Sequence, residues 1–225
     1  MSKRERAMNA RKPMLEFEAA VLADNPSAVI AGVDEAGRGP LAGPVVVAAV
    51  VIHEPLSFAL PVDDSKQLAE TVREELGVKL REDPGVSYSI AMRSAEEIDR
   101  MNILQATHAA MREAVMALNP LPDMALVDGL PVPRFPVPAQ FIVKGDARSV
   151  SIAAASILAK TTRDALMRQL DTQYPGYGFA KHKGYGTAEH LEAVRRLGPC
   201  PIHRITFAPI RDVIHPPMTQ PDLGF

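Results

Sequence analysis

The chain has 225 residues, of which 47% are hydrophobic and 23% are charged, and its formal net charge is −2. This composition is typical of one ordinary globular domain, and no apolar run reaches the roughly 18 to 20 residues that a membrane span needs. The charged N-terminus lacks the apolar stretch of an export signal, and the single cysteine, Cys200, excludes an internal disulfide. We therefore expect a cytoplasmic protein with no membrane partner.

The charge is unevenly distributed along the chain. Residues 54–99 carry 11 acidic and 5 basic side chains, whereas residues 144–212 carry 11 basic and 6 acidic ones. A basic C-terminal half beside acidic metal ligands is compatible with binding of a polyanion such as nucleic acid. Charge runs are more often simply solvated faces, so this asymmetry alone does not establish nucleic-acid binding.

The N-terminal residues 1–27 are polar and irregular, with a short helical stretch at 15–22, and we expect them to form an arm outside the core. Two β-branched apolar runs then predict antiparallel neighbouring strands at 29–33 and 45–52, joined by a glycine-rich turn. Three further strands are expected, at 87–92, 124–127 and 141–143. Helices are expected at 67–80, from Ser94 to before Pro120, at 149–170 and at 188–197.

This order of elements predicts a mixed α/β fold of about five strands, with helices covering the sheet. The first strands are expected to be antiparallel and the later ones parallel. We expect a core domain at residues 28–170, followed by a helical C-terminal extension and tail at 171–225 that pack on the core. Nothing in the sequence indicates an obligate oligomer, so a monomer is expected.

The most informative segment is residues 32–44, which read GVDEAGRGPLAGP. Asp34 and Glu35 follow a buried-looking strand, although ionised carboxylates are rarely buried without partners. A turn at Gly37 and Gly39 would allow both carboxylates to share one ion. A divalent metal is the natural candidate, although a solvated acidic turn is an equally ordinary interpretation of this pair alone.

Two more acidic residues follow predicted strands: Asp128 ends the run 124–127, and Asp146 comes shortly after 141–143. Sites in α/β sheets lie at strand ends, so these carboxylates are expected to meet Asp34 and Glu35 at one edge of the sheet. Each alone is more often a turn residue. Together they form an oxygen-only ligand set that suits Mg²⁺ or Mn²⁺, and two such ions support hydrolysis of a phosphodiester bond.

On these residues the chain resembles bacterial ribonuclease HII over about residues 29 to 212. The resemblance rests on GVDEAGRGPLAGP and on motifs that follow in the family's order: DSK at 64–66, VDG at 127–129, KGD at 144–146, SIAAASILAK at 151–160, TRD at 162–164 and HKGYGT at 182–187. It implies a ribonuclease H-like fold and cleavage of the RNA strand of RNA-DNA hybrids. It also implies incision on the 5′ side of ribonucleotides embedded in duplex DNA, leaving 5′-phosphate and 3′-hydroxyl ends, as in ribonucleotide excision repair.

The resemblance also implies roles for individual residues. The active-site carboxylates that would hold two Mn²⁺ or Mg²⁺ ions are Asp34, Glu35, Asp128 and Asp146. The backbone turn that would sense the ribose 2′-hydroxyl is formed by Gly37, Arg38 and Gly39. Tyr185 would pack on the neighbouring deoxyribose, and the plausible phosphate contacts include Lys66, Lys160 and Lys183.

Other residues receive plainer interpretations. Arg163, Asp164 and Arg168 are expected to form ordinary helix surface pairs, with a position behind the metal ligands as the alternative for Asp164. Ser151 and Ser156 are expected to be small packing residues. The histidines are expected to be structural or to face phosphate: His182, His190 and His203.

Three other functions compete with the proposed endonuclease. Residues 37–42 fit a loose dinucleotide-binding pattern, but the strand predicted from Val45 stands where that pattern requires a helix. A non-catalytic nucleic-acid binding module would bind hybrid without metal and leave it uncut. A junction resolvase or an exonuclease would share the fold but act on another substrate.

Overall fold

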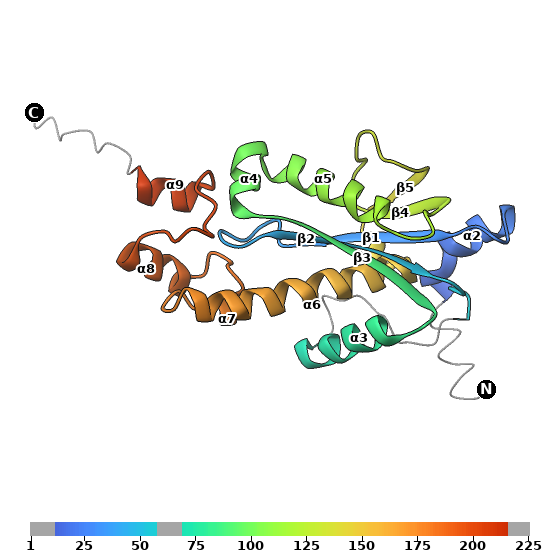
Figure 1. Cartoon of the computed structure of the whole chain (residues 1–225), viewed down its shortest axis with the longest axis horizontal. Helices are drawn as coiled ribbons and strands as arrows, with labels where there is room; N and C mark the ends of the chain where they lie inside the picture. Colours follow the sequence, from blue (N-terminus) through green and yellow to red (C-terminus); the bar gives the residue numbers. More distant parts are fainter. Residues whose placement is uncertain (1–11, 58–68, 216–225) are drawn as a thin grey trace, which may run out of the picture.

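The computed structural model describes residues 12–57 and 69–215, which form one mixed sheet covered by helices (Figure 1). The sheet order is β3-β2-β1-β4-β5, with antiparallel pairing within β3-β2-β1 and parallel pairing within β1-β4-β5. The strands are β1 (Ile30–Ala36), β2 (Val45–Ile52), β3 (Val86–Arg93), β4 (Met124–Asp128) and β5 (Ala139–Ile142). The predicted mixed α/β sheet, antiparallel first and parallel later, is therefore confirmed.

The helices form a layer on each side of this sheet. Figure 1 shows α4 and α5 on one face, α3 and α6 on the other, and α7 to α9 beyond the end of the sheet where β1 turns into β2. Their bounds are η1 (Lys12–Leu15), α2 (Glu16–Asp24), α3 (Glu70–Glu82), α4 (Ala95–Met101), α5 (Ile103–Met116), η2 (Gly145–Ala147), α6 (Val150–Gln173), α7 (Phe179–His182), α8 (Ala188–Leu197) and α9 (Ala208–Ile214). In the described residues no helix is long and apolar enough to cross a bilayer.

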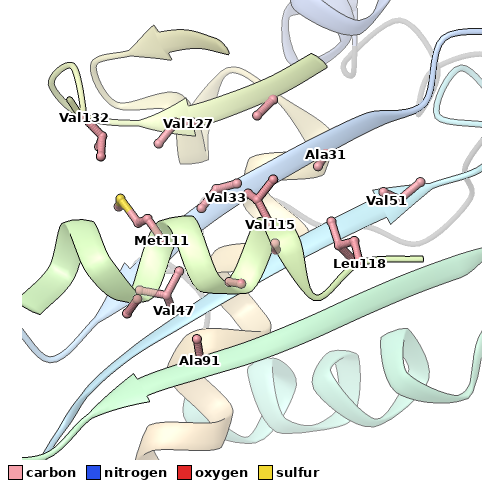
Figure 2. Packing of buried hydrophobic residues seen from close by; sticks show 14 residues of the cluster. Ala31, Val33, Val47, Val51, Ala91, Met111, Val115, Leu118, Val127 and Val132 are labelled. Carbon is pink, nitrogen blue, oxygen red and sulfur yellow. The ribbon is translucent and has the colours of Figure 1, made fainter. Parts of the chain in front are cut away.

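The core lies on both faces of β2, which explains why that strand reads as an unbroken apolar run. Alternate residues such as Val47 and Val51 pack against Met111 and Val115 of α5 (Figure 2). The intervening residues, such as Val50, face the cluster formed with α6. Because successive side chains of a strand point to opposite faces, a strand covered by helices on both sides must be apolar throughout.

Helix α6 begins in direct contact with β1, and a glycine makes this approach possible. A Cβ atom on Gly32 would stand 2.0 Å from the backbone carbon of Ser151. No side chain fits into that space, so the backbones of β1 and α6 touch here. This contact brings the first turns of α6 close to the strand that carries Asp34 and Glu35.

The helix expected between Ser94 and Pro120 is two helices, and the prediction of one long helix is wrong. Ser94 does begin α4, with a capping box to Glu97. The chain then breaks at Asn102, whose φ of 68° lies in the left-handed region that asparagine tolerates better than most residues. The Asn102 side chain accepts a hydrogen bond from the Gln105 N–H at 3.0 Å and so starts α5.

The expected N-terminal arm also differs from the prediction, since its described part packs on the core. Phe17 and Val21 of α2 contact the cluster that contains Ile30 and Ile152. Glu18 is fully buried and accepts hydrogen bonds from the Ser149 hydroxyl at 2.6 Å and the Ser151 N–H at 3.0 Å. An acidic side chain from α2 thus caps the first turn of α6, where unpaired N–H groups need acceptors.

Candidate active site at the ends of β1 and β4

The register of β1 and β4 places two of the predicted carboxylates side by side. Val33 pairs with Val127 in parallel strands, and Asp34 and Asp128 are the next residues of each strand. Val33 and Val127 belong to the cluster on the α5 side, so the alternation of side chains directs both aspartates to the α6 side. Ser156 of α6 forms a hydrogen bond with Asp34 there.

Asp34 is buried close to two other carboxylates, those of Glu35 and Asp128. Its side chain is 3% exposed, and Oδ1 accepts a hydrogen bond from the Glu35 N–H at 2.7 Å. Burial raises the pKa of Asp34 well above its usual value, and the negative charges of Glu35 and Asp128 raise it further, against the hydrogen bond from Ser156. A bound cation would relieve this repulsion and stabilise the ionised carboxylate.

Asp146 is brought to the same region by a backbone contact. Asp128 Oδ1 accepts a hydrogen bond from the Gly145 N–H at 2.7 Å, and Asp146 is the next residue, in η2. Lys144 adopts a left-handed conformation, with φ 57°, which makes the tight turn after β5 possible. The Asp146 side chain is 2% exposed and does not line the cleft that the other three carboxylates share.

That cleft has a volume of about 340 Å³ and opens beside the end of β1. Its predicted carboxylates are Asp34, Glu35 and Asp128. The predicted substrate-binding residues that also line it are Gly37, Arg38, Gly39, Lys160 and Tyr185. A larger cavity of about 590 Å³ lies at the other end of the strands, near Ile30 and Ile52, and contains none of these residues.

The glycine-rich turn and Tyr185 form one wall of the cleft. Gly37 has a φ of +97°, and a Cβ atom there would lie 2.1 Å from Nε of Arg163. Gly39 faces Tyr185, because a Cβ atom on it would lie 3.8 Å from Cε1 of that ring. The segment carrying Tyr185 is attached to the turn by the Leu41 N–H, which donates to the Gly184 carbonyl at 2.8 Å.

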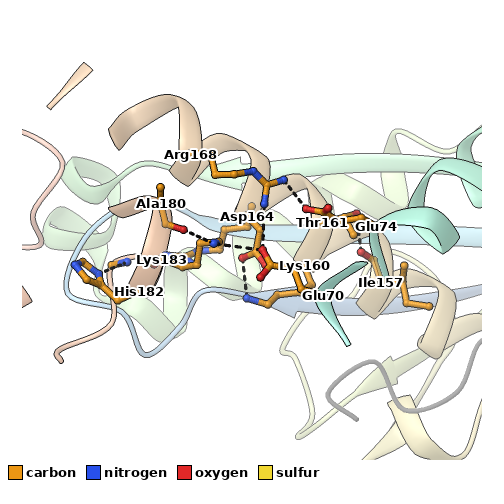
Figure 3. Close-up of polar contacts among 12 residues, drawn as sticks. Glu70, Glu74, Ile157, Lys160, Thr161, Asp164, Arg168, Ala180, His182 and Lys183 are labelled. Atoms are coloured by element: carbon orange, nitrogen blue, oxygen red, sulfur yellow. Dashed lines mark hydrogen bonds and ion pairs between the residues drawn. The ribbon is translucent and has the colours of Figure 1, made fainter. Parts of the chain in front are cut away.

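The lysines that were predicted to contact phosphate differ in their position relative to the cleft. Lys160 lines the cleft, and its Nζ binds Asp164 Oδ1 at 2.7 Å, so Asp164 pairs with a lysine (Figure 3). Lys183 does not line the cleft. Its side chain is 11% exposed and lies 3.4 Å from Oε1 of Glu70, with a further hydrogen bond to the Ala180 carbonyl. The prediction for Lys66 falls outside the described residues.

Sequence reasoning missed four contributors to this site: Ser156 and Arg73, which line the cleft, and Arg163 and Arg204, which donate to backbone carbonyls of residues 37–44. Ser156 was expected to be a packing residue, yet it lines the cleft and bonds Asp34. Arg163 was expected on the surface, yet it is 1% exposed and donates to the carbonyls of Ala42, Pro44 and Lys183. The TRD motif was the available signal for Arg163, whereas nothing near Arg204 distinguished that residue.

The donor set fits a hard divalent cation. The carboxylates supply only oxygen ligands, and burial together with the charges of Glu35 and Asp128 raises the pKa of Asp34, so a cation there would stabilise its ionised form. Within the described ranges no three acidic, histidine or cysteine side chains stand close enough to form a complete ligand set. Mg²⁺ typically takes one or two carboxylates and completes its shell with water and substrate phosphate oxygens, which suits such an open arrangement.

Comparison with known proteins gives a consistent answer. The family model described as Ribonuclease HII matches residues 31–210. Ribonuclease HII of Chlamydia trachomatis serovar D is 53% identical over 191 residues, covering 85% of this chain and 87% of the relative.

Among solved structures, ribonuclease H2 of Pyrococcus horikoshii OT3 has a TM-score of 0.70 at 29% identity, with 82% of this chain and 96% of that chain covered. Bst-RNase HIII, solved in complex with Mn²⁺, shares the fold with a TM-score of 0.62 at 20% identity, covering 84% of this chain and 70% of that chain. The family model spans most of the chain and the Chlamydia relative shares about half of its residues, so this chain belongs to the ribonuclease HII family of endoribonucleases, which cleave the RNA of RNA-DNA hybrids.

Proposed function

We propose that this chain is a metal-dependent endonuclease with two related substrates. It hydrolyses the RNA strand of RNA-DNA hybrids, and it incises on the 5′ side of ribonucleotides embedded in duplex DNA, leaving 5′-phosphate and 3′-hydroxyl ends. The observation that carries the proposal is the register of β1 and β4, in which Asp34 and Asp128 follow the paired residues Val33 and Val127. Both aspartates face a cleft whose wall includes the glycine turn and Tyr185.

The proposed ligands of two Mg²⁺ or Mn²⁺ ions are Asp34, Glu35, Asp128 and Asp146. When bound, the ions would activate the attacking water and stabilise the leaving oxygen. Asp34 is the central side chain of the proposed set, because it adjoins Glu35 in β1 and follows the Val33–Val127 pair on β1 as Asp128 does on β4. Ser156 holds the Asp34 carboxylate from the α6 side, and the Gly145 N–H holds Asp128. The Mn²⁺ complex of the distant Bst-RNase HIII supports a divalent ion in this fold.

Substrate selection is assigned to the opposite wall of the cleft. The backbone of Gly37, Arg38 and Gly39 would sense the 2′-hydroxyl that separates RNA from DNA. Tyr185, 47% exposed, offers a ring surface on which a sugar can pack. Lys160 is the proposed phosphate contact, and Asp164 orients it through their ion pair at 2.7 Å.

The remaining assignments have less support. Lys183 is tied to Glu70 within the protein, which favours a structural role over a phosphate contact. Lys66 as a phosphate contact, a monomeric state, a cytoplasmic location and a role in ribonucleotide excision repair stay predictions.

A panel of four substrates tests the proposed function: an RNA-DNA hybrid, a duplex with one ribonucleotide, an all-DNA duplex and branched DNA. With Mn²⁺ or Mg²⁺ present, we expect cleavage of the RNA-DNA hybrid and of the duplex with one ribonucleotide, the latter at its ribonucleotide, and no cleavage of the other two substrates. After chelation of the metal with EDTA, no substrate should be cleaved. Hybrid that is bound but left uncut with metal would indicate a binding module. Cleavage of branched or all-DNA substrates would indicate a resolvase or an exonuclease instead.

A further inference from the structure

Arg204 lies fully buried behind the glycine-rich turn, and its guanidinium donates to backbone carbonyls of this turn and lies over the Phe207 ring. Its Nη2 donates to the carbonyls of Gly37 at 2.6 Å and Gly43 at 2.8 Å. Its Nη1 donates to the Arg38 carbonyl at 2.8 Å, and Nε donates to the Gly43 carbonyl at 3.0 Å. One guanidinium from the C-terminal region thus holds three carbonyls of a turn about 160 residues earlier in the chain.

Stabilising a turn with a buried guanidinium carries a high desolvation cost. In the described part of the chain, no carboxylate lies within ion-pair distance of Arg204, so its buried charge is compensated by carbonyl dipoles, by the Phe207 ring at 5.1 Å and by the more distant charge of Asp99. Burial and the nearby charge of Arg163 lower the pKa of Arg204 to about 9. The side chain therefore remains protonated at neutral pH. A buried charge costs several kcal/mol of desolvation, which indicates that the carbonyl positions it fixes matter.

The carbonyls held by Arg204 determine where the neighbouring amides point. In a trans peptide the C=O of one residue and the N–H of the next are directed oppositely, and the bonds of this turn are trans. Fixing the Gly37 carbonyl inward therefore directs the Arg38 N–H outward. Fixing the Arg38 carbonyl does the same for the Gly39 N–H.

Both amides are on the cleft side of the turn. Arg38 and Gly39 are exposed and line the cleft, and Gly39 faces the ring of Tyr185. Within residues 12–57 and 69–215, neither N–H donates to a protein acceptor. They are therefore two donors aimed at the space beside the proposed sugar platform.

We propose that Arg204 is the positioning residue that keeps the Arg38 and Gly39 amides directed at the ribose 2′-hydroxyl, and so sets the discrimination of ribonucleotide from deoxyribonucleotide. The inference rests on the proposed function and adds to it a residue outside the recognised motifs. A hydroxyl accepts hydrogen bonds from fixed amides, and a deoxyribose leaves those amides unpaired. A site built around such donors therefore rejects the analogue that lacks the hydroxyl.

The test measures binding of two duplexes, identical except that one nucleotide is a ribonucleotide or a deoxyribonucleotide, with metal removed by EDTA. Wild type should prefer the ribonucleotide duplex. Arg204→Lys, whose single ammonium nitrogen lacks the planar fork of donors that reaches all three carbonyls, should lose about tenfold of that preference while its affinity for the all-DNA duplex stays unchanged. A folded Arg204→Lys variant with the wild-type preference would overturn the inference.

Arg81→Lys is the matched control. Arg81 also donates to a backbone carbonyl, that of Gly77, and to the hydroxyls of Thr161 and Thr162, but it does not line the cleft. It should lose stability and keep the full preference for ribonucleotide. An equal loss of preference in Arg81→Lys would show that general destabilisation is responsible and would overturn the assignment.

A measurement on the wild-type protein covers the case in which Arg204→Lys does not fold. The amide proton resonances of Arg38 and Gly39 should shift when the ribonucleotide duplex binds and shift clearly less with the deoxyribonucleotide duplex. Equal shifts would overturn the inference, even if the wild type cleaves the hybrid. If the wild type shows neither cleavage with metal nor any preference in binding, the proposed function fails together with the inference.

Discussion

Asp128 accepts a hydrogen bond from the backbone N–H of Gly145 at 2.7 Å, across 17 residues of sequence. This bond ties the end of β4 to the turn that carries Asp146. It uses one oxygen of the Asp128 carboxylate, and the same carboxylate repels Asp34. The Asp128 side chain therefore contributes both to the local fold and to the negative charge of the site.

Two substitutions of Asp128 separate these contributions. Asp128→Asn keeps an oxygen that can accept from Gly145 and removes the charge that repels Asp34, so the free energy of unfolding should be unchanged or slightly higher. Asp128→Ala leaves the Gly145 N–H unpaired and should cost about 1 to 3 kcal/mol. Urea unfolding of both variants in metal-free buffer checks this. Equal stability of the two variants would show that the bond to Gly145 contributes nothing.

Replacing Tyr185 should affect cleavage of the substrate and have little effect on the free energy of unfolding. The residue is 47% exposed, and its ring faces Gly39, which has no side chain to pack against it. Tyr185→Ala should slow incision at a single embedded ribonucleotide by roughly tenfold to a hundredfold, on the scale of a lost base or sugar stacking contact. Tyr185→Phe keeps the ring and should remain close to wild type. Steady-state kinetics on the one-ribonucleotide duplex provide the measurement, and a slow Phe variant would transfer the role from the ring to the hydroxyl.

Glu18 should stabilise the start of α6. It is fully buried, and it accepts hydrogen bonds from Ser149 and the Ser151 N–H. Glu18→Ala should lower the free energy of unfolding by about 2 kcal/mol, the typical cost of losing a cap and leaving buried donors unpaired. Glu18→Gln keeps an acceptor oxygen, and because burial already raises the pKa of Glu18, it should lose less. The account would be contradicted if chemical denaturation showed Glu18→Gln to be less stable than Glu18→Ala.

The environment of His203 leads us to predict that the free energy of unfolding decreases in acid. Its Nδ1 accepts from the Cys200 N–H at 2.9 Å, its Nε2 donates to Nε2 of His190 at 3.0 Å, and His190 Nδ1 donates to the Tyr185 carbonyl at 2.9 Å. Burial and the neighbouring histidines lower the pKa of His203 from 6.5 to about 4. Protonation of His203 would add a proton to Nδ1 and place its N–H against the Cys200 N–H, whose hydrogen bond it accepts in the folded protein.

The sign of the effect follows from the lowered pKa. The unfolded chain binds a proton near pH 6.5 and the folded chain only near pH 4, so stability is complete above pH 6.5 and falls as the pH drops towards 4. The loss should reach at most about 3 kcal/mol. Unfolding titrations between pH 7 and pH 4 measure it, with His203→Gln as the comparison. A variant as sensitive to acid as the wild type would assign the effect to other groups.

The sequence predicted the elements whose signals are local. The β-branched runs predicted β1 and β2, and Thr187 and Ser94 correctly predicted where α8 and α4 begin. The candidate carboxylates stood out in combination and through the family motifs, because Asp34 and Asp128 both follow apolar strands although each alone is more often a turn residue. Sequence did not reveal that Asp146 lies outside the cleft lining, because that depends on the left-handed turn at Lys144.

The missed features depend on contacts between distant segments. Asn102 splits a helix whose apolar pattern continues through the break, so periodicity could not detect it. Glu18 lies in a segment that was expected to form an arm outside the core, and its burial could not be predicted because its partners are more than 130 residues away. Arg163 was expected to be a surface charge, since arginine is rarely buried without an acid, and no motif drew attention to Arg204. Their acceptors are backbone carbonyls, which leave no mark on the sequence.

The most direct test of the central claim is the cleavage rate of Asp34→Asn on a duplex with one ribonucleotide, at saturating Mn²⁺. Asparagine keeps the size of the side chain and removes the charge that Glu35 and Asp128 crowd. We predict a loss of at least a hundredfold in rate, with circular dichroism and thermal unfolding showing a folded protein. A folded Asp34→Asn variant that cleaves as fast as the wild type would contradict the assignment of the active site to the ends of β1 and β4.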